Sequence, residues 1–172
     1  MKKLFPLFLS FLFCVSCATS YQKMAADNVK DLSLALKAID QGYAIFYKSA
    51  AENLMKNHDW LVSLQNKSQL EIIKDFQTQM KIYDDTIVDI QKCRDQIKSL
   101  ASKFDSNSKV DPATISEELA AFELYKKILV TADTVKVDIS PSLVSLSTQM
   151  CNRNVEIANF YHLPPPVCNF VK

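Results

Sequence analysis

Residues 68–105 read SQLEIIKDFQTQMKIYDDTIVDIQKCRDQIKSLASKFD, and this stretch decides the fold. Its apolar side chains recur at alternating steps of three and four residues for about ten turns, which is the spacing of one face of an α-helix. Ser68 and Glu71 have the spacing of a capping box, which predicts that the helix begins there. The expected seam is Ile73, Phe76, Met80, Tyr83, Ile87, Ile90, Arg94, Ile97, Ala101 and Phe104.

Arg94 is the one charged residue on this predicted seam. We expect its side chain either to reach the surface or to be a buried charge that pairs with an acid across the bundle. Binding of an anionic ligand or partner is the alternative role. The nearby acids Asp84, Asp85 and Asp89 are expected on the opposite, solvated face of the helix.

Three further helices are expected from the same periodicity. Residues 25–56 carry a seam of Val29, Leu32, Leu36, Ile39, Tyr43, Phe46 and Ala50. Asp111 followed by Pro112 predicts one helix start, and Ser140 followed by Pro141 predicts another. A single rod kinked at Pro141 is the alternative to two separate helices, and the cap at Ser140 favours the break. The seams that follow these starts are Ile115, Leu119, Phe122 and Leu129, then Leu143, Leu146, Met150, Ile157, Phe160 and Tyr161.

These elements predict an all-α fold, an up-down bundle of about four amphipathic helices. The first two helices are expected to run to roughly 50 Å and the last two to about 35–40 Å. A long first hairpin should therefore project beyond the body. We expect a signal peptide at residues 1–16, a tether at 17–24, the bundle at 25–163, and a Pro-rich tail at 164–172 that folds back on the bundle. The single glycine, Gly42, argues against a β-rich fold and against Gly-rich nucleotide sites.

The N-terminus has the composition of an export signal. Three residues, Met1 to Lys3, form a basic start, and residues 4–15 are a largely apolar run. That run is too short to span a bilayer as a stable helix, but it suits a signal peptide. It ends in CVSCATS, residues 14–20, where small residues permit cleavage before Cys17 or after Ala18.

The segment Val15-Ser16-Cys17 resembles the lipobox of bacterial lipoproteins. The resemblance implies cleavage before Cys17, attachment of lipid to its thiol, and a protein anchored in a membrane. With Ala18 in the next position, it implies the outer membrane, with the protein facing the periplasm. The resemblance covers only the first 20 residues and implies nothing about the activity of the mature domain. Cleavage after Ala18, which would give a secreted soluble protein, is the alternative.

Cysteines of an exported protein can form disulfides. We expect Cys151 to pair with Cys168, because the last helix rises about 15 Å beyond Cys151. An extended Pro-rich segment can return a similar distance at about 3.1 Å per residue. Cys93 is the alternative partner of Cys151, and otherwise it is expected to be a small buried apolar residue.

The chain carries no pattern that predicts catalysis, a cofactor or a metal. Its formal net charge is +1, which gives no electrostatic reason to bind nucleic acid. His58 and His162 have no partner at metal-ligand spacing, and no glutamate is followed three residues later by histidine. No Gly-x-Ser-x-Gly motif occurs. We therefore expect a protein that is not an enzyme and has no catalytic, cofactor or metal residues.

Three hypotheses of function follow. The first is a membrane-anchored envelope lipoprotein with a non-enzymatic role, either structural or in binding an envelope protein. The second is a periplasmic or secreted inhibitor or immunity-type protein that blocks a toxin or hydrolase. The third is an enzyme or small-ligand carrier that uses the bundle interior, which would require a cavity of several hundred Å³ around Arg94.

Overall fold

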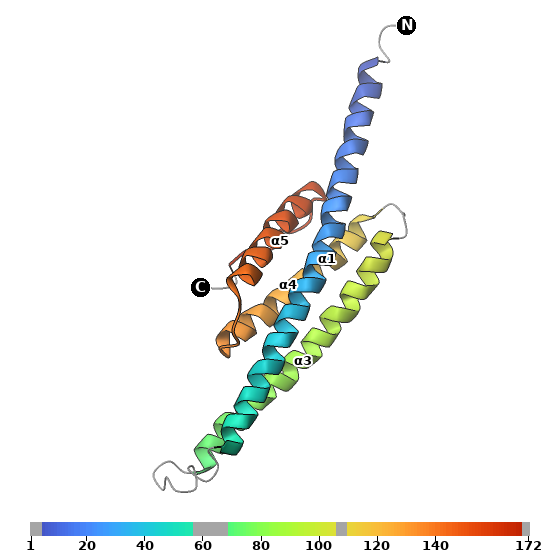
Figure 1. Ribbon diagram of the computed structural model, residues 1–172. Helices are drawn as coiled ribbons and strands as arrows, with labels where there is room; N and C mark the ends of the chain where they lie inside the picture. The colour runs from blue at the N-terminus through green and yellow to red at the C-terminus, as the bar shows by residue number, and fades with distance from the viewer. Residues whose placement is uncertain (1–4, 57–68, 106–109, 170–172) are drawn as a thin grey trace.

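Four helices make up the fold in the computed structural model, which describes residues 5–56, 69–105 and 110–169 (Figure 1). They are α1 (Phe5–Lys56), α3 (Gln69–Asp105), α4 (Pro112–Thr134) and α5 (Pro141–Phe160). The described ranges contain no strand. Helix α1 packs against each of the other three, and α4 also contacts both α3 and α5. The prediction of an all-α bundle of four helices is confirmed.

The first hairpin is longer than the body that surrounds it. Figure 1 shows α1 and α3 extending together past the turn between α4 and α5, at the end next to residues 57–68. The segment of α1 from Gly42 to Lys56 alone measures about 21 Å at the standard rise of a helix. The long first hairpin is therefore present, as the helix lengths predicted.

Helix α1 begins earlier than the sequence pattern suggested. It starts at Phe5 rather than near residue 25, so it includes residues expected to form a tether. Between Pro6 and Gly42 the chain has neither proline nor glycine, so nothing in the backbone interrupts the helix. Tyr21 and Met24, from the expected tether, pack against an apolar cluster that contains Ala25 and Ile157.

The predicted seam of α1 is the buried face of that helix. Its members from Val29 to Tyr43 are almost fully buried, and Phe46 packs against the same core. The seam of α5 is buried at Leu143, Met150 and Ile157, whereas Phe160 is exposed and stacks on Tyr21 with ring centroids 4.3 Å apart.

The seam predicted for α3 is rotated relative to the one observed. The buried stripe is Thr86, Ile90, Cys93, Ile97 and Leu100, whereas Ile87 is 40% exposed. The predicted seam contains Ile90 and Ile97 of this stripe. It has Ile87, Arg94 and Ala101 where the buried residues are Thr86, Cys93 and Leu100. Both stripes have the same helical spacing, so α1 and α4, which pack against α3, decide which one is buried.

Local capping fixes where α4 and α5 begin. The side chain of Asp111 accepts a hydrogen bond from Thr114 N at 2.7 Å, and that of Ser140 accepts one from Leu143 N at 3.3 Å. Proline occupies the first turn of each helix, as predicted. The two helices are separate rather than one kinked rod. The capping box expected at Ser68 and the turn at residues 106–109 lie outside the described residues.

Both of these helices end in a Schellman motif without glycine. Lys136 and His162 have φ angles of 65° and 56°. At the first end, Val137 N donates to Ala132 O at 2.9 Å, and at the second, Leu163 N donates to Ala158 O at 2.8 Å. These bonds satisfy carbonyls that a helix end otherwise leaves without partners.

Candidate functional site

The Pro-rich tail is fastened to the bundle by a disulfide. Cys151 and Cys168 are joined by an S–S bond of 2.04 Å, the pairing expected from the sequence. Cys168 packs against the main core cluster, and Lys126 Nζ donates to Val167 O at 3.2 Å. The tail therefore lies back on α4 and α5, as expected, up to residue 169; residues 170–172 lie outside the described part.

Cys93 takes no part in this disulfide. It is a buried thiol on α3, and its Sγ lies 3.6 Å from the carbonyl oxygen of Ala121 on α4. Burial, with a smaller effect from Asp89, raises the pKa of the Cys93 thiol to about 12. The residue is therefore a small core side chain rather than a reactive nucleophile.

Arg94 is not a buried charge, because its side chain reaches the surface, which was one of the two arrangements expected from the sequence. Its side chain is 39% exposed, and Nη2 donates to Asp40 Oδ2 on α1 at 2.8 Å. Its Nη1 also donates to Gln91 Oε1 at 2.8 Å. The rotation of α3 places Cys93 rather than Arg94 toward the core, so Arg94 lies at the edge of the α1–α3 contact. Its pairing with Asp40, an acid of another helix, is the second arrangement that was expected.

Among the described residues, the fully buried carboxyl group is that of Glu118, which sequence reasoning missed. Its side chain is 0% exposed, and it lies on α4 close to Asn28 of α1 and Asn154 of α5, which are also buried. Burial raises the pKa of Glu118 to about 8. Hydrogen bonding by Asn154 and Asn28 and the positive charge of Arg153 lower the pKa, but by less. Asn28 Nδ2 donates to Asn154 Oδ1 at 2.5 Å. We call these three residues the Glu118 cluster.

An ion pair lies beside the Glu118 cluster, nearer to solvent. Arg153 Nη2 of α5 bonds to Asp31 Oδ2 of α1 at 2.5 Å, and both side chains are about one quarter exposed. A second buried polar contact, between Tyr125 and Ser147, has its hydrogen bonds in place: the two hydroxyls are 2.5 Å apart, and Ser147 Oγ donates to Leu143 O at 2.8 Å. The Glu118 cluster differs from it because several of its polar atoms have no partner.

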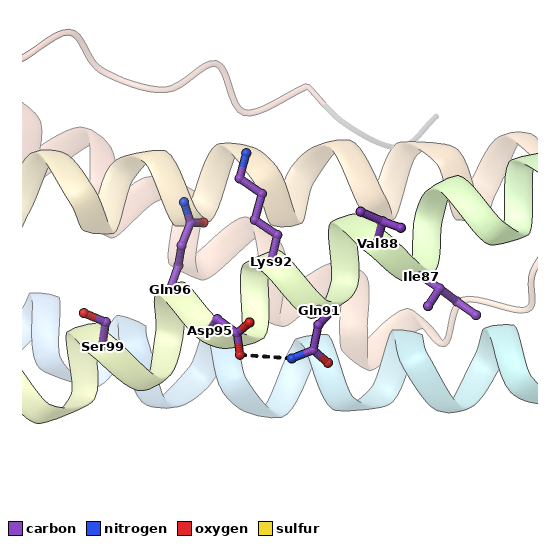
Figure 2. A pocket seen from close by; sticks show the side chains of 7 residues that line it. All are labelled: Ile87, Val88, Gln91, Lys92, Asp95, Gln96 and Ser99. Atoms are coloured by element: carbon purple, nitrogen blue, oxygen red, sulfur yellow. Dashed lines mark hydrogen bonds between the residues drawn. The ribbon is translucent and has the colours of Figure 1, made fainter.

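The outer face of α3 carries an open groove. It is lined by Ile87, Val88, Gln91, Lys92, Asp95, Gln96 and Ser99. Figure 2 shows Lys92 and Gln96 pointing to one side of the helix, and Gln91 and Asp95 to the other, where Gln91 Nε2 donates to Asp95 Oδ1 at 3.0 Å. The groove lies on the surface of a single helix and Arg94 does not line it. It is therefore not the interior cavity that the ligand-carrier hypothesis required.

Apolar side chains are exposed near the base of the projecting hairpin. Ile45 on α1 is 68% exposed and Val88 on α3 is 67% exposed. Tyr47 and Tyr83 stack across the two helices, with ring centroids 4.7 Å apart. Aromatic contact thus helps to hold the two helices of the hairpin together, and the hairpin also exposes apolar side chains to solvent.

Other predicted positions bring no chemistry together. Within the described ranges, no three His, Cys, Asp or Glu side chains are grouped closely enough to hold a metal ion. His162 is an exposed residue at the end of α5, and His58 lies outside the described residues. Cys17 falls within α1, but its side chain also lies outside the described part. Among the described residues, no helix has both the length and the apolar character needed to cross a membrane.

No family model matches this chain, and no curated protein and no solved structure is significantly similar to it.

Proposed function

We propose that this chain is an exported protein, anchored through lipid on Cys17 to the outer membrane and facing the periplasm, that binds an envelope protein through its α1–α3 hairpin. The role is non-enzymatic. The lipobox-like segment that ends at Cys17 supports the anchoring, and the form of the hairpin supports the binding.

The observation that carries the proposal is the continuity of α1. One helix contains both Cys17 and the hairpin residues up to Lys56. At about 1.5 Å per residue, these two positions are roughly 60 Å apart along the helix axis. A bundle attached at Cys17 would therefore hold the end of its hairpin well away from the membrane surface, where an envelope protein can reach it.

The exposed side chains of the hairpin suit a protein partner. Ile45 and Tyr47 on α1, with Ile87 and Val88 on α3, are apolar or aromatic and exposed. Two antiparallel helices present a shallow groove that can take the apolar face of another helix. Large apolar side chains that gather on one part of a surface are typical of such contacts.

Two measurements in cells test the proposal. The substitution Cys17→Ser should move the protein from the membrane fraction to the soluble fraction. A photo-crosslinking residue at Ile45 should give a discrete adduct with an envelope protein, whereas the same residue at Gln149, an exposed position on α5, should not.

Each half of the proposal fails separately. Unchanged fractionation of the Cys17→Ser variant would exclude the lipid anchor. Equal adducts from Ile45 and Gln149 would show that the hairpin has no special part in binding. A soluble, fully processed protein that captures a secreted hydrolase would instead favour the inhibitor hypothesis.

A further inference from the structure

The Glu118 cluster contains polar atoms that do not satisfy one another as they stand. The bond from Asn28 Nδ2 to Asn154 Oδ1 uses one polar atom of each amide. Asn28 Oδ1, Asn154 Nδ2 and both carboxyl oxygens of Glu118 are buried and make no well-aligned hydrogen bond, although the two amides lie close enough to the carboxyl to lower its pKa. Buried polar atoms without hydrogen bonds lower the stability of the fold. We therefore expect an arrangement of the cluster in which each of these atoms forms a hydrogen bond.

The protonation state of Glu118 decides whether the polar atoms of the cluster can all form hydrogen bonds. Asn154 Nδ2 needs an acceptor, and Asn28 Oδ1 needs a donor. An ionised carboxylate offers acceptors only, whereas a carboxylic acid offers one donor and one acceptor. Turning both amides over exchanges their roles but leaves the same need for one donor and one acceptor. Only the neutral acid supplies both.

We propose that Glu118 is held as a neutral carboxylic acid that closes a ring of three hydrogen bonds with Asn28 and Asn154, and that loss of its proton loosens α5 from α1 and α4. In this ring Asn28 donates to Asn154, Asn154 donates to the carbonyl oxygen of Glu118, and the hydroxyl of Glu118 donates to Asn28 Oδ1. The ring includes one residue from each of three helices, so it acts as a proton-dependent latch.

The surroundings of Glu118 agree with a neutral acid. Burial raises its pKa to about 8, and this effect exceeds the lowering of the pKa by the amides of Asn154 and Asn28 and by the charge of Arg153. On α5, the charge of Arg153 is already paired with Asp31 of α1. On α4 itself, Glu117 is exposed and pairs with Lys103 of α3. The rival arrangement is an ionised Glu118 that accepts from Arg153 Nε, which is also buried without a partner.

The latch gives stability a definite dependence on pH. The pKa of Glu118 is raised in the folded state above its ordinary value of 4.5, so the folded protein keeps a proton that the unfolded chain loses. The stability contributed by this proton is complete below the unfolded pKa and is lost as the pH rises through the folded pKa. Between pH 4.5 and about pH 8, the unfolding equilibrium constant should rise by up to about tenfold per pH unit.

The substitution Glu118→Gln tests the latch, because the glutamine amide offers a donor and an acceptor at every pH. Urea titrations of the purified protein at several pH values should show the variant equal to the wild type near pH 4. Near pH 8, the unfolding equilibrium constant of the variant should be smaller than that of the wild type by about tenfold or more. Glu117→Gln is the matched control: it makes the same chemical change at an exposed neighbour and should leave the pH dependence of the wild type in place.

Infrared spectroscopy supplies a second readout. The C=O band of a buried carboxylic acid should be present at neutral pH in the wild type and in Glu117→Gln, and absent in Glu118→Gln. A Glu118→Gln variant that is less stable than the wild type at neutral pH, or does not fold, would overturn the proposal in favour of an ion pair with Arg153. Parallel pH dependence of the two proteins would overturn it as well.

Discussion

Gly42 and Val137 are in contact where the segment between α4 and α5 crosses α1. A Cβ atom built on Gly42 would lie 3.0 Å from Val137 Cγ1. Glycine in the middle of a helix costs roughly 0.5–1 kcal/mol relative to alanine. The only glycine of the chain therefore occupies a position where a side chain would press on a buried valine.

We expect Gly42→Ala to leave stability nearly unchanged, because the gain in helix propensity is offset by the close contact with Val137. The same substitution in a Val137→Ala background should stabilise by about 0.5–1 kcal/mol, since the shorter side chain leaves room for the new methyl group. Urea denaturation of the four proteins of this cycle measures the difference. If Gly42→Ala alone stabilised the protein by about 0.5–1 kcal/mol, the segment between α4 and α5 would not be in tight contact with α1.

Glycine should be favourable at Lys136 and His162, which have positive φ angles. A left-handed backbone costs a residue with a Cβ roughly 1–2 kcal/mol, and glycine is not subject to this cost. Lys136→Gly and His162→Gly should each raise the free energy of unfolding by about 1 kcal/mol. Lys98→Gly, an exposed position inside α3, should lower it by a similar amount. Destabilisation at all three positions would contradict the assigned backbone angles.

Loss of the disulfide between Cys151 and Cys168 should destabilise the protein by about 3 kcal/mol, the value expected for a closed loop of this length. The double substitution to alanine and the reduced wild type should therefore both unfold at lower urea concentration. The tail near Pro164 to Pro166 should then become sensitive to proteases. Equal midpoints with and without reductant would show that the bond adds nothing to the fold.

Cys93 should resist alkylation in the folded protein. Burial keeps its thiol pKa near 12, so little thiolate is present at pH 8, and the side chain is not accessible. Iodoacetamide should modify Cys93 only after the protein is unfolded without reductant, and mass spectrometry of the peptide that contains Cys93 measures this. Rapid modification of the folded protein would mean that the contact between α3 and α4 opens readily.

The ion pair of Arg94 and Asp40 should contribute less than about 1 kcal/mol, because both side chains are roughly 40% exposed and water screens their attraction. A double-mutant cycle with Arg94→Gln and Asp40→Asn measures this coupling, and added salt should reduce it further. A coupling of several kcal/mol would restore the buried charge that the sequence pattern suggested.

Features that depend on neighbouring residues could be predicted from the sequence. The caps at Asp111 and Ser140 are decided within one helical turn, and the disulfide to Cys168 follows from a short segment of known reach. The rotation of α3 could not be predicted in this way. Two adjacent stripes have the same spacing, and the choice of Cys93 over Arg94 depends on helices far away in the sequence.

The Glu118 cluster was missed for a related reason. Glu118 follows another acid and reads as part of a solvated face, but Ile115 and Phe122 place it at a buried spacing on α4. Asn28 lies beside buried Val29 on α1, and Asn154 falls four residues after buried Met150 on α5. A polar residue at a core position in each of three helices was the signal that could have identified the cluster before the structure was known.

The unbroken helix α1 also fixes a direction. A residue added or removed between Cys17 and Tyr21 would turn everything beyond it by about 100° and shift it by about 1.5 Å. If the protein is held at Cys17, the side of the bundle that faces a neighbour in the plane of the membrane is set by the phase of this one helix. The length of that short segment is then a determinant of orientation, independent of the side chains that it carries.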